Sequence, residues 1–216
     1  MKCIESCYKL VKDSAHQWTL FDDENKKIKI NFDLDQKNYR RKNSRGFKDP
    51  LLKAVGLGKG THNVLDLSAG LGIDSVFFAQ NGLKVTAVER HPLVYFLLQK
   101  ALQQTTRKDL GPLEFIFSEA EDYLKQYSPE KWECIYFDPM YPEKKKSSLP
   151  RQQMQVFRQM IGADLDAEGV LKLALEQNCQ RVVIKRPLHS EFLLRQPLQS
   201  IEGKTVRFDI YINSNK

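Results

Sequence analysis

The sequence predicts an α/β fold built on a mostly parallel sheet, with a small β appendage at the N-terminus. From residue 63 onward, short apolar runs alternate with helical segments, and glycine turns separate the two. The apolar runs are continuous, as is typical of parallel strands that helices cover on both faces. Near the C-terminus, two further runs flank Glu202-Gly203-Lys204 and predict an antiparallel hairpin that closes the sheet.

The first 36 residues predict short strands joined by turns. The segment 27–34 alternates apolar and polar residues, the pattern of a half-buried strand. A basic linker follows over 37–48. We therefore divide the chain into an appendage with its linker, 1–45, and a main domain, 46–216.

The main domain begins with a short helix over 49–60 that glycines bring to an end. Pro92 suits the first turn of another predicted helix. The predicted helices after the first are 72–82, 92–104, 119–127 and a helical region at 151–177. The predicted strands are 63–67, 83–89, 113–117, 133–137 and 181–185, followed by the hairpin over 198–212.

The composition is that of a globular protein, with 41% hydrophobic and 28% charged residues among 216. No apolar run reaches about 18 residues, the length that spans a bilayer, and residues 1–10 lack the apolar core of a signal peptide. We therefore expect a cytoplasmic protein without membrane contacts. The four cysteines form no CxxC pair and have no nearby histidines, so we expect reduced thiols and no metal site.

The chain is basic, with a net charge of +7 and a pI of about 9.1. Such a charge favours phosphate polymers, anionic membranes or acidic proteins as partners. Two clusters carry much of the excess, and together they favour a nucleic acid. The first lies within 37–48, where the predicted nucleic-acid contacts are Arg40, Arg41, Lys42 and Arg45, and the second is Lys144, Lys145 and Lys146.

A strand, a glycine turn and a helix start follow one another in "VLDLSAGLGIDS", residues 64–75. Its small residues let a nucleoside approach the backbone at the carboxyl edge of the sheet, where ligands of such folds bind. Glu89 ends the next strand, where its carboxylate can accept hydrogen bonds from both ribose hydroxyls. The predicted contacts in the turn are Asp66, Ser68, Gly70 and Gly72.

The ligand of this turn is unlike a dinucleotide. The G-x-G-x-x-G pattern is absent, and Asp74 at the helix start would repel a pyrophosphate. A cationic ligand without phosphate fits better, and S-adenosyl-L-methionine is such a ligand. A nicotinamide-dependent oxidoreductase is disfavoured on the same grounds.

A second turn, in "IYFDPMYPEKKKSS" (135–148), follows the strand 133–137 at the same edge. Asp138 and the Pro139 carbonyl can accept hydrogen bonds from an exocyclic amine, and the Tyr141 ring can stack on the target base. Such a base has to leave its stack to reach the pocket. The lysines that follow would then hold neighbouring phosphates.

These blocks, together with "VERHPLV", "FRQMIGADLDAEGVL", "RVVIKRP" and "RFDIYI", resemble the RsmJ family over residues 37–216. The family consists of bacterial enzymes that methylate the N2 amine of a guanosine near the 3′ end of small-subunit (16S) ribosomal RNA. The resemblance implies a Rossmann-like class I S-adenosylmethionine-dependent methyltransferase fold. It also implies cofactor contacts at Ile73, Asp74, Glu89, Arg90, Glu119, Ala120 and Asp138, with Ser118 as the alternative to Glu119.

The strand 181–185 ends with Lys185, and Arg186 follows it; we interpret this pair as a phosphate clamp or a wall of the base pocket. A pair of solvent-facing cations at a strand end is an equally weighted interpretation. The expected partner is 16S ribosomal RNA or the small ribosomal subunit, and the oligomeric state stays open. Two further functions also fit the sequence: methylation of adenine N6 or another nucleic-acid base, and RNA binding without catalysis.

Overall fold

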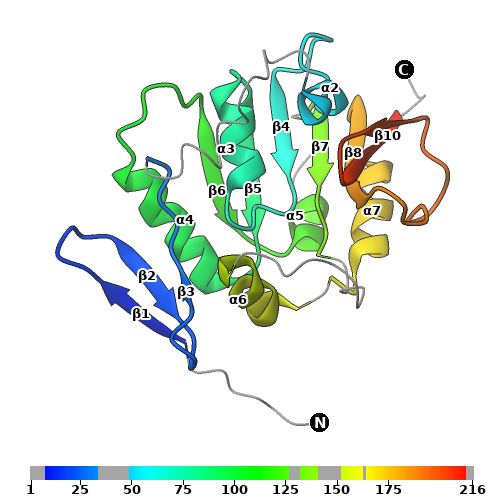
Figure 1. Cartoon of the computed structure of the whole chain (residues 1–216). Helices are drawn as coiled ribbons and strands as arrows, with labels where there is room; N and C mark the ends of the chain where they lie inside the picture. Colours follow the sequence, from blue (N-terminus) through cyan, green and yellow to red (C-terminus); the bar gives the residue numbers. More distant parts are fainter. Residues whose placement is uncertain (1–7, 34–48, 127–131, 141–151, 163, 213–216) are drawn as a thin grey trace.

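The computed structural model describes residues 8–33, 49–126, 132–140, 152–162 and 164–212 (Figure 1). A seven-stranded sheet forms its centre, with the strand order β6-β5-β4-β7-β8-β10-β9. The strands are β4 (Asn63–Asp66), β5 (Lys84–Glu89), β6 (Leu113–Phe117), β7 (Cys134–Phe137), β8 (Arg181–Pro187), β9 (Gln199–Glu202) and β10 (Val206–Ile212). The strands β4 to β8 run parallel, whereas β10 is antiparallel to both β8 and β9, so the predicted sheet and hairpin are confirmed.

The chain changes direction of winding at β4. This strand pairs with β5 on one side and with β7 on the other, so that Asp66 lies in register with Ala87 and Tyr136. The carboxyl ends of β4 and β7 are therefore neighbours at a topological switch point, the place where open α/β sheets bind their ligands.

Helices cover both faces of the sheet. One hydrophobic core contains residues of α2 (Pro50–Val55), α3 (Ile73–Gln80), α4 (Pro92–Gln104) and α6 (Gln152–Ile161), and the opposite core contains those of α5 (Ala120–Gln126) and α7 (Ala167–Glu176). The predicted helical region 151–177 is thus two helices, and Gly162 follows the first with a positive φ of 76°. None of the described helices is long and apolar enough to cross a membrane.

The N-terminal strands β1 (Lys9–Lys12), β2 (Trp18–Phe21) and β3 (Lys27–Ile28) form a separate antiparallel sheet beside α4 and α6 (Figure 1). The Trp18 and Phe96 rings meet edge to face, with centroids 5.1 Å apart. Phe32 is buried in the same core as α3 and α4. The small sheet is therefore packed onto the main domain, and the boundary between residues 45 and 46 stays a prediction, since it falls outside the described residues.

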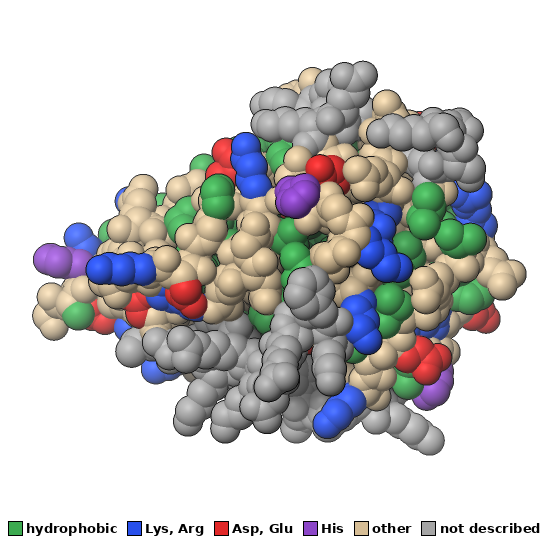
Figure 2. Space-filling model, turned by 90° about the horizontal axis from the view of Figure 1, so that it is seen from above, with side chains coloured by type: hydrophobic (Ala, Val, Ile, Leu, Met, Phe, Trp, Pro, Cys, Tyr) green, Lys and Arg blue, Asp and Glu red, His purple; other side chains and the backbone are tan. Residues whose placement is uncertain are grey.

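The end of the sheet at which the parallel strands begin is seen in Figure 2. In the part of this face that the structure describes, Lys and Arg side chains are dispersed among hydrophobic and other residues. The carboxyl ends of the strands, which carry the predicted site residues, lie at the opposite end, next to α6 (Figure 1).

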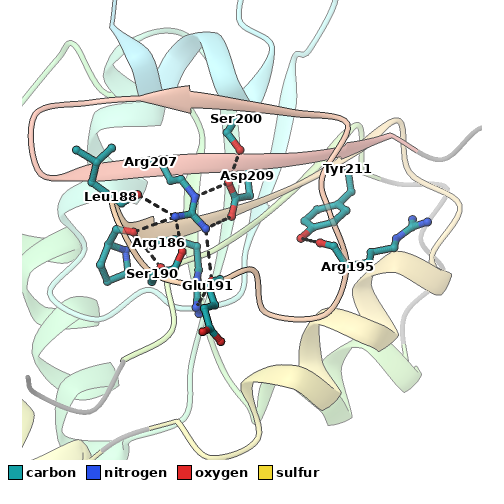
Figure 3. Close-up of polar contacts among 10 residues, drawn as sticks. Arg186, Leu188, Ser190, Glu191, Arg195, Ser200, Arg207, Asp209 and Tyr211 are labelled. Carbon is teal, nitrogen blue, oxygen red and sulfur yellow. Dashed lines mark hydrogen bonds and ion pairs between the residues drawn. The ribbon is translucent and has the colours of Figure 1, made fainter.

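A buried arginine fixes the segment that follows β8 (Figure 3). The Nε and Nη2 atoms of Arg207 bind the carboxylate of Asp209 at 2.9 and 3.1 Å, and Asp209 is fully buried. The Nη1 atom of Arg207 donates to the carbonyl oxygens of Leu188 and Ser190 at 2.9 and 2.6 Å. One guanidinium group thus joins β10 to the segment that follows the carboxyl end of β8.

We expect Arg207→Met to lower the free energy of unfolding by about 3–5 kcal/mol, because it leaves the buried Asp209 carboxylate without its cation. Urea unfolding followed by circular dichroism measures the loss. The control is Lys125→Ala, which breaks an exposed pair with Glu121 and should cost less than about 1 kcal/mol. Equal small losses in the two variants would show that Arg207 does not hold this segment.

Candidate active site

Asp66, the last residue of β4, organises the turn that follows. Its Oδ1 atom accepts hydrogen bonds from the Ser68 backbone N–H and hydroxyl at 2.9 and 3.2 Å, and its Oδ2 atom accepts one from the Ser75 hydroxyl at 2.5 Å. Burial raises the pKa of Asp66 to about 6, against the effect of these hydrogen bonds. Both carboxylate oxygens of Asp66 accept hydrogen bonds from the protein itself, and these bonds stabilise the conformation of the turn.

Two glycines in the turn have backbone angles that favour glycine. Gly70 has a φ of 54°, and its N–H donates to Glu89 Oε2 at 2.9 Å. Gly72 has a φ of 76°, and a Cβ atom there would lie 2.9 Å from Leu98 Cδ2. The first glycine therefore connects the turn to β5, and the second lets α4 pack against it.

Glu89 lies at the end of β5 with both carboxylate oxygens engaged. Oε2 accepts the Gly70 N–H, and Oε1 accepts the His91 N–H at 2.8 Å. Only 5% of the residue is exposed, and burial raises the pKa of Glu89 to about 7 although both N–H groups act to lower it. Each oxygen retains a lone pair that can accept a ribose hydroxyl.

A pocket opens between this turn, the ends of β5 to β7, and α6 and α7. Apolar side chains such as Leu67, Val88 and Phe137 form much of its wall. The predicted site residues that line it are Ser68, Gly70, Glu89, Arg90, Ser118, Glu119, Ala120 and Asp138. Apolar walls together with the two carboxylate oxygens of Glu89 match the base and ribose of adenosine.

Other predicted residues lie elsewhere. Those described by the structure that do not line this pocket are Asp66, Gly72, Ile73, Asp74, Pro139, Lys185 and Arg186. The residues Tyr141, Lys144, Lys145 and Lys146 lie outside the described part of the chain, as do Arg40, Arg41, Lys42 and Arg45. The roles of these eight undescribed residues stay predictions.

The pocket also has lining residues that the sequence did not single out, among them Phe157, Asp164 and Asp166. Asp164 pairs with Met140, since its Oδ2 atom accepts the Met140 N–H at 2.6 Å and its own N–H donates to the Met140 carbonyl at 2.9 Å. Arg90 donates to the carboxylates of Asp164 and Asp166. The block "FRQMIGADLDAEGVL" contains these acids, but nothing in its pattern shows that they close the pocket.

Asp138 follows β7 and is tied directly to the cofactor turn. Its backbone N–H donates to the Ser68 hydroxyl at 2.7 Å, and this hydroxyl donates to Asp66 Oδ1. Ser68 stands where many nucleotide-binding turns have glycine, and its hydroxyl bridges the two neighbouring strand ends. The structure thereby joins the two turns that the sequence assigned to cofactor and target.

Lys185, two residues before the end of β8, lies between two carboxylates. Its Nζ atom is 2.7 Å from Asp138 Oδ2 and 2.9 Å from Asp74 Oδ2, and the Tyr136 hydroxyl donates to the same Asp74 oxygen at 2.7 Å. Arg186 is buried and donates to the Glu191 carbonyl at 2.7 Å. In this geometry both cations contact groups of the protein itself, and their roles as a phosphate clamp or as a wall of the base pocket stay predictions.

The charges of this cluster oppose one another. Burial raises the pKa of Asp138, and Lys185 acts to lower it. Burial would lower the pKa of Lys185, but the two carboxylates overcome this and raise it, so that the ammonium group stays charged. Among the described residues, no three His, Cys, Asp or Glu side chains form a group that could hold a metal ion.

Comparison with known proteins identifies the family. The model of a family described as putative SAM-dependent methyltransferase matches residues 5–213. Ribosomal RNA small subunit methyltransferase J from Bdellovibrio bacteriovorus is 46% identical over 192 residues, which cover 88% of this chain and 76% of that protein. The enzyme of the same name from Vibrio parahaemolyticus is 41% identical, over 82% of this chain and 74% of that protein. This chain belongs to their family.

The fold agrees with a solved relative. The crystal structure of a SAM-dependent methyltransferase from Neisseria gonorrhoeae matches with a TM-score of 0.73 and 27% identity, over 100% of this chain and 86% of that one. The class I methyltransferase fold expected from the sequence is thus confirmed, and the protein is an enzyme that uses S-adenosyl-L-methionine. The apolar pocket with Gly70 and Glu89 fits the nucleoside part of this cofactor.

We expect Glu89→Gln to weaken binding of S-adenosylhomocysteine by about 10- to 100-fold at pH 8, the effect of losing hydrogen bonds to a charged acceptor. Ribose hydroxyls donate to the ionised carboxylate, so the affinity of the wild-type protein should rise as the pH rises through about 7. Titration calorimetry across this range measures both effects.

The glutamine variant should lack that rise. As a control, Glu121→Gln changes an acid of α5 that does not line the pocket, and it should leave affinity and pH dependence unaltered. Wild-type affinity of Glu89→Gln at pH 8 would remove Glu89 from the cofactor site.

Proposed function

We propose that this protein transfers a methyl group to the N2 amine of a guanosine near the 3′ end of small-subunit ribosomal RNA. The names of its relatives from B. bacteriovorus and V. parahaemolyticus support the RNA substrate. The observation that carries the proposal is the position of Asp138, which lines the pocket of Glu89 and is bonded through its backbone to Ser68.

The chemistry requires a group that grips an amine. The lone pair of an exocyclic amine is delocalised into the ring, so the amine is a poor nucleophile. When its two N–H groups donate to the Asp138 carboxylate and the Pro139 carbonyl, the lone pair is left to face the cofactor, and positioning provides much of the acceleration. S-adenosyl-L-methionine supplies the electrophilic methyl group.

The target base has to leave its stack to reach Asp138. Tyr141 follows two residues after the Pro139 that is proposed to accept one N–H group, so its ring is the candidate for stacking on the base. The Lys144–Lys146 cluster and the basic linker are the candidates for RNA phosphates. A ribosomal RNA substrate also favours the cytoplasm as the place of action.

Asp138→Ala tests the proposal. Small-subunit RNA from a strain that lacks the protein is incubated with labelled cofactor, and the modified base is mapped by mass spectrometry. The wild-type protein should yield N2-methylguanosine, and Asp138→Ala should lose about 100-fold or more of the rate while still binding RNA. Asp109→Ala, a surface control, should remain active. N6-methyladenine as the product, or normal turnover by Asp138→Ala, would contradict the proposal.

Reversing the charges of Lys144, Lys145 and Lys146 tests the RNA contacts. Each phosphate contact releases counterions, so the variant should bind RNA with a flatter dependence on salt. Filter binding at several salt concentrations measures the slope. A slope equal to that of the wild-type protein would place these lysines outside the interface.

A further inference from the structure

Among the described residues, Lys185 is the cation nearest to Asp138, the proposed amine-binding residue. It reaches Asp138 from β8, the strand next to β7, and its side chain is only 20% exposed. Its ammonium group contacts Oδ2 of Asp138 and also Oδ2 of Asp74, at the start of α3. A lysine held at both contacts is poorly placed to reach an RNA phosphate.

We propose that Lys185 is a positioning residue of the methyl transfer: it holds Oδ2 of Asp138 and thereby directs Oδ1 toward the N–H group of the target amine. The inference rests on the proposed function, because it takes the target to be a base amine. It assigns to Lys185 a role inside the active site.

Asp74 and Tyr136 fix the position of the Lys185 ammonium group. Asp74 binds it from the side of α3, and the Tyr136 hydroxyl, which is fully buried, donates to the same Asp74 oxygen. The backbone of Asp138 is held independently by Ser68. With its backbone N–H and its Oδ2 atom both anchored, the Asp138 side chain has little freedom to rotate.

The charge of Lys185 also favours the ionised form of Asp138, because it acts to lower the pKa of that carboxyl group. An ionised carboxylate accepts hydrogen bonds from an amine, whereas a protonated one donates its own proton. The acids Asp74 on α3 and Asp164 beyond α6 both favour protonation of Asp138, as burial does. Tyr136 on β7 is the other titratable group of the cluster. Asp66 on β4 is connected to Asp138 through the Ser68 hydroxyl, which donates to Asp66 and accepts the Asp138 N–H. Lys185 is the cation that acts against these groups and lowers the pKa of Asp138, and its ammonium group is 2.7 Å from Asp138 Oδ2.

The test compares Lys185→Met with Lys185→Arg, in single-turnover rates measured across pH. Lys185→Met removes the cation, so we expect the rate near neutral pH to fall by about 100-fold. Without the cation the pKa of Asp138 rises further, so the acid limb of the pH profile should move to higher pH. Part of the lost rate should therefore return as the pH is raised.

Lys185→Arg keeps the positive charge, so its acid limb should stay near that of the wild-type protein even though its rate falls. Tyr136→Phe removes a hydrogen bond of the same cluster without altering a charge, and it should leave the acid limb in place. If Lys185→Met does not fold, as judged by circular dichroism, Lys185→Gln carries the same test, because it retains hydrogen bonding without charge.

A readout independent of turnover is the carboxyl resonance of Asp138 in protein labelled with carbon-13. Its titration midpoint should move to higher pH in Lys185→Met, and the salt dependence of RNA binding should stay unchanged. Superimposable pH profiles and midpoints would overturn the proposal. So would a loss confined to RNA affinity with a flatter salt slope, which would restore Lys185 as a phosphate contact. Failure of the proposed function would instead show in the wild-type protein, as absence of N2-methylguanosine.

Discussion

The hydrogen bond from the Asp138 N–H to the Ser68 hydroxyl connects the two halves of the active site. The pairing of β4 with β7 brings the carboxyl ends of both strands together, but pairing alone leaves the loops after them free to diverge. Ser68 removes this freedom, because its hydroxyl accepts the Asp138 N–H after β7 and donates to Asp66 at the end of β4. The pairing of the strands and this hydrogen bond together fix the position of Asp138, the proposed amine-binding residue, relative to the glycine turn.

Several carboxylates crowd this edge, and each has a different partner. Asp66 is held by hydroxyl and amide groups, and Glu89 by two backbone N–H groups. Asp138 and Asp74 share Lys185, while Asp164 pairs with Arg90. Because burying an unpaired charge is very costly, these pairings explain how so much negative charge remains at the site without disrupting the fold. They also leave Glu89 and Asp138 with unused lone pairs for ligands.

Much of the fold could be predicted from the sequence because its strands are apolar runs bounded by glycine turns, and the helix over 92–104 was predicted with its observed bounds. The sequence also placed the glycine turn and Glu89 at the same edge of the sheet, but it did not predict the hydrogen bond between Gly70 and Glu89. The contacts of Lys185 with Asp138 and of Asp164 with Met140 could not be predicted either, since they join elements far apart in the chain. Sequence alternation separates Lys185 from Arg186 by face, but it does not show that one of them meets Asp138.

A crystal structure with S-adenosylhomocysteine and a guanosine-containing fragment of small-subunit ribosomal RNA tests the central claim most directly. The decisive distance joins the guanine N2 atom to Asp138. The account predicts a hydrogen bond from N2 to Oδ1 of Asp138, with Lys185 on Oδ2 and Ser68 on the backbone N–H. A guanine bound away from Asp138, or a Lys185 that has left the carboxylate for an RNA phosphate, would contradict it.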